Sequence, residues 1–118
     1  MKRLCAALTA VFLFILVAPA FAVDVTGELV DLSCYNKDKV KNVGTAHQEC
    51  AVLCAKKGMT AAIVTDSGEV YRVSGALAEN NNARLVRFMG QRVAIQGSLG
   101  VSNDGTKTIL GGAIKRVK

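Results

Sequence analysis

Residues 60–74, TAAIVTDSGEVYRVS, determine the fold class that the sequence predicts. Segments 60–65 and 69–74 are rich in β-branched and aromatic side chains, which is typical of strands. The triplet at 66–68, Asp-Ser-Gly, is a turn signal between them. The stretch therefore predicts a β-hairpin in a chain built mainly from strands.

The segment before this hairpin predicts a first strand and a helix. Residues 24–33 (DVTGELVDLS) are expected to form the strand, and the polar residues 35–44 a loop. Thr45 with Gln48 three residues later has the pattern of a capping box, so a helix is expected over 46–57.

Gly58 follows that helix and suits the position just beyond a helix end, where a left-handed backbone is common. Lys56 and Lys57 suit the negative end of the helix dipole.

The segment after the hairpin predicts a second, short helix. The asparagines at 80–82 offer N-caps, and Gly90 offers an end. Leu85, Phe88 and Met89 would lie on one face of this helix and be buried.

Two further strands complete the pattern. Residues 91–98 (QRVAIQGS) alternate between apolar and polar, and 106–117 follow the turn signal Asn-Asp-Gly at 103–105. Five strands with a helix between the third and fourth match an OB-fold order. The prediction is a mainly β (β+α) chain: a five-stranded OB-fold-like barrel with a Cys/His helix between strands 1 and 2 and a short helix between strands 3 and 4.

Residues 1–22 have the features of a secretory signal peptide. Lys2 and Arg3 precede an apolar run at 8–17, and Ala20 and Ala22 are the small residues of a cleavage site. The expected mature domain is 23–118, periplasmic or secreted, with no stable membrane insertion once the leader is removed.

The net charge and the way it is distributed indicate which kinds of partner the chain is expected to bind. The chain has 118 residues, 15 Lys+Arg and 9 Asp+Glu, and removal of Lys2 and Arg3 would leave a net charge of +4. The basic residues are scattered, so nucleic acid is not an expected partner, whereas an envelope protein or an anionic surface remains open. Neither a GxGxxG nor a GxxxxGK[ST] motif occurs, which excludes the common nucleotide-binding loops.

The candidate site is a cluster of cysteines with the only histidine. On a continuous helix, Cys50 and Cys54 would lie about 60° and about 20° from His47, on one face. Cys34 ends the first predicted strand and could reach that face. Three mature cysteines permit one disulfide with a spare thiol, or a metal site.

Three hypotheses use this cluster. A Cys3His site of Cys34, His47, Cys50 and Cys54 would suit Zn²⁺ or Cu(I). A disulfide would join Cys34 to Cys50 or Cys54, because Cys50 and Cys54 are too far apart on a helix to pair with each other. Thiol redox chemistry at Cys50 is the third, although the chain lacks a Cys-x-x-Cys motif.

Four stretches carry a resemblance to a known group: TGELVDLSCY (26–35), HQECAVLCAKKGM (47–59), GEVYRVSG (68–75) and GQRVAIQGSL (90–99). Together they resemble small exported bacterial OB-fold-like proteins of unknown function. The resemblance implies a fold and an export route, and it brings no established activity. The expected function is that of an exported, non-enzymatic binding or structural protein of the cell envelope, whose helix is held to the barrel by the cysteines. The alternative is a periplasmic protein that binds Zn or Cu(I).

Overall fold

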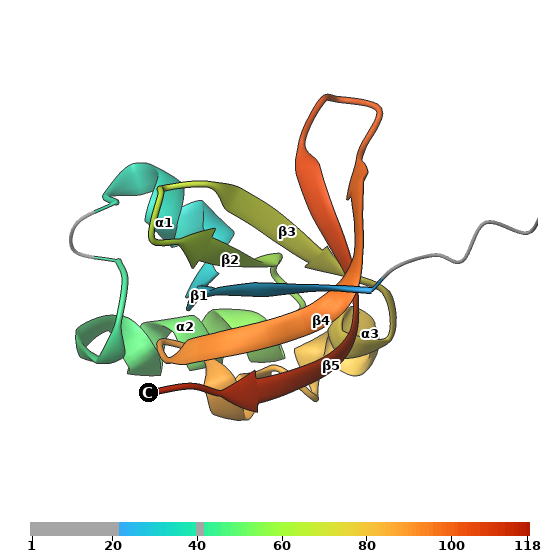
Figure 1. Cartoon of the computed structure of the whole chain (residues 1–118). Helices are drawn as coiled ribbons and strands as arrows, with labels where there is room; N and C mark the ends of the chain where they lie inside the picture. The colour runs from blue at the N-terminus through green and yellow to red at the C-terminus, as the bar shows by residue number, and fades with distance from the viewer. Residues whose placement is uncertain (1–21, 40–41) are drawn as a thin grey trace, which may run out of the picture.

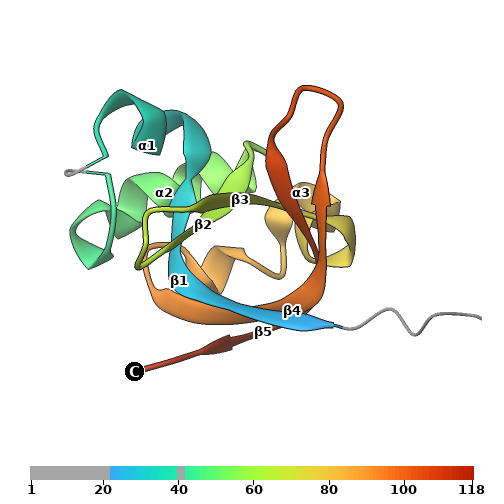
Figure 2. The ribbon, with the colours of Figure 1, turned by 45° about the horizontal axis from the view of Figure 1, so that its top comes forward.

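Five strands form a closed ring in the computed structural model, which describes residues 22–39 and 42–118 (Figures 1 and 2). The order around the ring is β1-β2-β3-β5-β4, and β1 pairs with both β2 and β4. All neighbours are antiparallel except β3 and β5, which are parallel. The strands are β1 (Val23–Asp31), β2 (Ala61–Thr65), β3 (Val70–Ser74), β4 (Arg92–Val101) and β5 (Lys107–Arg116).

Apolar side chains fill the centre of the fold. Leu29 faces Ile63 across the β1–β2 pair, and Ile95 faces Ile114 across β4–β5. Leu29, Ile63 and Ile95 are fully buried in one cluster. In β4, the alternation over 91–98 that predicted the strand places Val93 and Ile95 in this cluster.

The predicted hairpin at 60–74 is confirmed. The backbone N–H of Thr65 donates to the carbonyl of Glu69, and Gly68 adopts a φ of +85° in the turn between them. The turn at 103–105 is also confirmed. It joins β4 to β5, and this second hairpin extends away from the rest of the ring (Figure 1).

Two strand glycines permit close approach of neighbouring backbones. A Cβ atom on Gly27 would lie 2.1 Å from the carbonyl oxygen of Val64, and one on Gly97 would lie 2.1 Å from that of Leu110. The register of the β4–β5 pair shifts between Gln96 and Gly97. No side chain fits at either glycine without moving the adjacent strand.

The expectation of a loop over 35–44 is wrong at its start, where the chain forms helix α1 (Leu32–Lys37). The side chain of Asp31 caps this helix by accepting a hydrogen bond from the backbone N–H of Cys34. α1 covers the outer face of β1, where Tyr35 packs with Val30 and Ala62 in a second apolar cluster.

The predicted capping box at Thr45 and Gln48 is also wrong. Thr45–His47 form a 3-10 turn, η1, and helix α2 (Gln48–Lys56) follows with His47 at its N-cap and no side-chain capping bond. Gly44 precedes this turn with a φ of +73°, in the left-handed region. The backbone therefore reaches α2 through a tight 3-10 turn and does not form a continuous helix over 46–57.

The single short helix predicted after the hairpin is broken into three turns: η2 (Gly75–Ala78), α3 (Glu79–Asn82) and η3 (Val86–Phe88). Asn80, Asn81 and Asn82 have positive φ angles, which interrupt a right-handed helix instead of capping it. The predicted burial of Leu85, Phe88 and Met89 is confirmed.

The C-terminal end of α2 is fixed by two features. Gly58 has a φ of +81° and donates its backbone N–H to the carbonyl of Ala55, as the sequence predicted for a helix end. The Nδ2 of Asn82 donates to the carbonyls of Ala55 and Met59, at 3.0 and 2.8 Å. This residue is buried and ties the asparagine segment to α2.

The predicted signal peptide lies outside the described residues, apart from Ala22. Among the residues that the structure describes, no helix combines the length and the apolar character needed to cross a bilayer.

Candidate functional site

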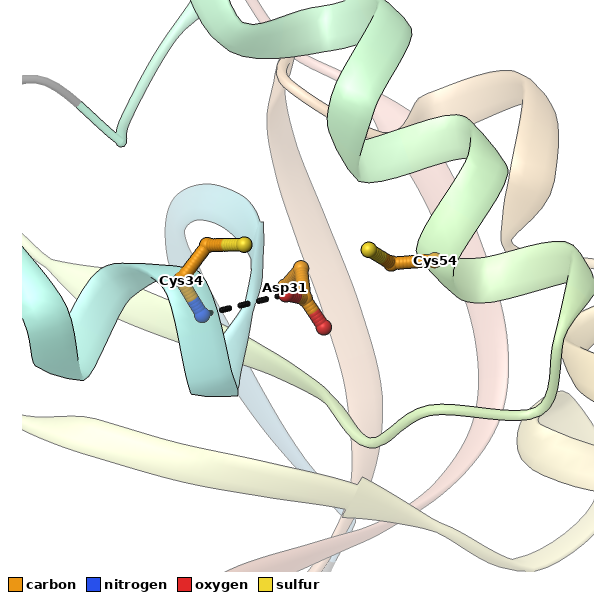
Figure 3. Close-up of side chains that lie close together, drawn as sticks. All are labelled: Asp31, Cys34 and Cys54. Carbon is orange, nitrogen blue, oxygen red and sulfur yellow. Dashed lines mark hydrogen bonds between the residues drawn. The ribbon is translucent and has the colours of Figure 1, made fainter.

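Three side chains from three elements meet where α1 and α2 face each other. The ligand atoms of Asp31, Cys34 and Cys54 all lie within 4.8 Å of one another. Figure 3 shows the two sulfur atoms on either side of the Asp31 carboxylate. We call these three residues the junction site.

The local fold positions each member. Asp31 is the last residue of β1 and pairs with Ala61 of β2. Cys34 lies three residues later, in the first turn of α1. Cys54 lies on α2 between Ala51 and Ala55, whose small, fully buried side chains let α2 approach the ring closely.

Asp31 is a buried charged residue, with an exposed fraction of 1%. Its Oδ2 accepts hydrogen bonds from the hydroxyl of Ser33 at 2.9 Å and from the backbone N–H of Cys34 at 3.1 Å. Its Oδ1 is buried and has no N–H or O–H donor among the described residues. One half of this carboxylate is thus satisfied and the other half is not, an arrangement that costs stability.

The Asp31 carboxylate controls the acidity of its neighbour. A hydrogen bond to Asp31 raises the pKa of the Cys34 thiol to about 11, with further contributions from burial, from the negative charge of Asp31 and from Cys54. A thiol with this pKa is protonated at neutral pH. Thiol catalysis, which requires a ready thiolate, is therefore not favoured at Cys34.

The structure brings together only part of the predicted ligand set. Cys34 and Cys54 are within 4.8 Å of each other, whereas Cys50 is exposed on α2 and His47 lies in the η1 turn. His47 has a buried Nε2 with no hydrogen-bond partner among the described residues, but it is not a member of the junction site. Because α2 begins after His47, the helical spacing that aligned His47, Cys50 and Cys54 does not apply across the turn.

Asp31 is the residue that sequence reasoning missed. An aspartate three residues before a cysteine at the end of a strand has the spacing of an N-cap, and this spacing would have predicted both α1 and the proximity of Asp31 to Cys34. Its burial depends on α1 and α2 packing around the strand end, which no local pattern reveals.

The junction site is suited to two kinds of chemistry. None of the three described cysteines is in a disulfide, and the sulfur atoms of Cys34 and Cys54, which lie within 4.8 Å of each other, would have to approach to the ~2.05 Å of a disulfide bond. Two thiolates and a carboxylate are also ligands that transition metals accept.

Comparison of the chain with protein-family models, with curated proteins and with solved structures gave no match.

Proposed function

We propose that residues 23–118 form an exported, non-enzymatic binding or structural protein of the cell envelope, in which a Cys34–Cys54 disulfide fastens α1 to α2. The observation that carries this proposal is the position of the two sulfur atoms, within 4.8 Å of each other on two separate helices. Of the two pairings open from the sequence, Cys34 with Cys54 is the one that this distance favours, because Cys50 is exposed on α2 and outside the group.

We further propose that the ring is an OB-fold-like barrel. The strand order with its parallel β3–β5 pair supports this assignment. So do the Cys-bearing α2 between β1 and β2 and the short helical turns between β3 and β4. The resemblance of the four sequence stretches to exported OB-fold-like proteins points the same way.

The disulfide would form by thiol–disulfide exchange with an oxidised partner, either a protein or a small-molecule disulfide. Cys34 and Cys54 each lose a proton, one S–S bond forms between them, and the two electrons reduce the partner to its dithiol. The bond would close a loop of roughly 20 residues and stabilise the folded state by about 3 kcal/mol. A small domain with a limited core benefits from such a link.

Export and the disulfide are tested together by expressing the full chain in a bacterial host and recovering the periplasmic fraction. The mature protein is expected to begin at Val23. Alkylation before reduction is expected to label Cys50 alone, and alkylation after reduction should label all three mature cysteines.

A Cys50→Ser variant is the matched control and should retain the Cys34–Cys54 link. Cys34→Ser and Cys54→Ser should each leave the other junction cysteine as a free thiol, labelled when the unreduced protein is alkylated in urea, and lower the thermal stability of the oxidised protein. Retention of the protein in the cytoplasm with its leader intact would refute the export proposal, and a link that includes Cys50 would refute the pairing.

A further inference from the structure

We propose that the junction site, when its two cysteines are reduced, binds one Zn²⁺ ion through Cys34 Sγ, Cys54 Sγ and a carboxylate oxygen of Asp31, with the fourth position open to an external ligand. This inference deepens the proposed function, since it assigns a ligand to the same cysteine pair. It rests on the dithiol form of the pair and does not require that the disulfide forms.

The geometry is the first argument. Tetrahedral zinc with Zn–S bonds of about 2.3 Å and Zn–O bonds of about 2.0 Å places its ligand atoms roughly 3.3–3.8 Å apart. The three ligand atoms of the junction site lie within 4.8 Å of one another. The ligand atoms would have to draw somewhat closer to reach that spacing, and Figure 3 shows the two sulfur atoms on either side of Asp31.

The second observation concerns the Asp31 carboxylate. The Oδ1 of Asp31 is buried and accepts no hydrogen bond from any N–H or O–H group of the described residues. A buried carboxylate oxygen without a donor is costly, and a cation is a partner that removes this cost.

The other oxygen of the same carboxylate is already held. Oδ2 accepts from the Ser33 hydroxyl and from the backbone N–H of Cys34, so the carboxylate is oriented before any ion arrives. Hydrogen bonds of this kind from outside the ligand set commonly fix metal ligands in place.

Two sulfur atoms and one carboxylate oxygen favour Zn²⁺ over the other common metal ions. Two sulfur ligands disfavour Ca²⁺ and Mg²⁺, which take oxygen ligands. Two thiolates and one carboxylate carry three negative charges, so a divalent ion leaves a net charge of −1, whereas Cu(I) would leave −2 at a partly buried site. Zn²⁺ also accepts carboxylate oxygen more readily than Cu(I), which prefers sulfur. Binding replaces the two thiol protons, which are released to solvent.

The test is a zinc titration of the mature protein after reduction by a phosphine and removal of metal by dialysis against a chelator. Competition with a chromophoric zinc indicator then gives stoichiometry and affinity. Wild type and Cys50→Ser are expected to bind one Zn²⁺ with equal affinity. Loss of a hydrogen-bonding partner outside the ligand set commonly costs about 10- to 100-fold in metal affinity, so loss of a ligand should cost at least as much. Cys34→Ser and Cys54→Ser should each weaken binding at least about 100-fold, and Asp31→Asn, which keeps one oxygen, at least about 10-fold. Asp24→Asn, which removes an exposed carboxylate of the same strand, should change nothing.

Cobalt substitution reports the ligands directly, and it is read on wild type and Cys50→Ser, neither of which loses a residue of the junction site. Co²⁺ bound to the wild-type protein should show the near-ultraviolet charge-transfer band of two thiolate ligands, unchanged in Cys50→Ser. The proposal is overturned if reduced wild type binds no more tightly than the Cys34→Ser/Cys54→Ser double variant, or if Cys50→Ser abolishes the band. Neither result bears on the disulfide, which is read from the alkylation of unreduced periplasmic protein in urea with a chelator present, so the two proposals fail separately.

Discussion

Asn82 and Asp31 are the two buried polar side chains of the described chain, and they differ in how their polar atoms are used. Asn82 donates two hydrogen bonds, to the carbonyls of Ala55 in the last turn of α2 and of Met59 just beyond it. Asp31 caps α1 with one oxygen and leaves the other without a hydroxyl or amide donor. Both side chains are as buried as the apolar residues of the core.

The two side chains therefore have different roles: Asn82 stabilises the fold, whereas Asp31 belongs to the candidate binding site. A buried polar side chain with satisfied hydrogen bonds fixes a conformation, as Asn82 does for the left-handed turns at 80–82. A buried charge with a free oxygen beside two thiols reduces stability unless something else binds there. We therefore expect substitution of Asn82 to damage the fold, and substitution of Asp31 to alter chemistry more than stability.

The largest expected effect is on the reactivity of Cys34 in the reduced, metal-free protein. Because Asp31 and burial raise the pKa of this thiol from 9.0 to about 11, its thiolate fraction at pH 8 should be about 100-fold below that of an ordinary cysteine. Alkylation of Cys34 by iodoacetamide, followed by peptide mass spectrometry, should accelerate as the pH rises until it levels off near pH 11.

Asp31→Asn is the matched variant for that experiment. It removes the negative charge that opposes the thiolate, so the pKa of Cys34 should fall and its alkylation at pH 8 should speed up. An unchanged rate in Asp31→Asn would contradict the assigned role of the carboxylate.

Asn82→Ala should destabilise the protein by about 2 kcal/mol, because it removes two hydrogen bonds and places an alanine at a φ of +59°. The measurement is urea unfolding followed by circular dichroism. Asn82→Gly, which tolerates the left-handed backbone, should recover part of the loss. Equal losses in both variants would show that the backbone conformation contributes little.

Asp31→Asn should change the unfolding free energy of the reduced, metal-free protein by no more than about 1 kcal/mol. The asparagine side chain still offers an oxygen that caps α1, and the substitution also removes a buried negative charge. The same urea experiment measures it. A loss of unfolding free energy as large as that of Asn82→Ala would show that Asp31, like Asn82, mainly stabilises the fold.

The smallest expected effect is that of an exposed ion pair. Asp66 and Arg92 are joined at 2.7 Å, and the hydrogen bond and charge of Arg92 lower the pKa of the Asp66 carboxyl. Asp66→Asn should lower the urea midpoint only slightly, because the pair is exposed, and this loss should shrink in high salt. A loss as large as that of Asn82→Ala that persists in high salt would mean that Asp66 has a structural role beyond this pair.

The strands were predictable because their segments are rich in β-branched residues and their turns carry glycine with Asp or Asn, and residues 91–98 also alternate between apolar and polar. The helices were less predictable. α1 is short and polar, and it depends on the cap from Asp31; the capping box at Thr45 fails because Gly44 and the η1 turn set the entry to α2.

The candidate site was predictable only in part. The sequence indicated Cys34 and the cysteine-bearing helix, but not which helix cysteine faces Cys34, since a tight turn separates His47 from α2. The burial of Asp31 arises from packing between elements far apart in the chain, and only the three-dimensional structure reveals it.

The most direct test of the central claim is a peptide map of the cysteines in the mature protein, recovered from the periplasm without reductant or chelator. We expect Cys34 and Cys54 to be protected together, either in a shared disulfide-linked peptide or under a zinc ion that a chelator removes, while Cys50 is alkylated at once. Equal alkylation of all three cysteines without any treatment would contradict it.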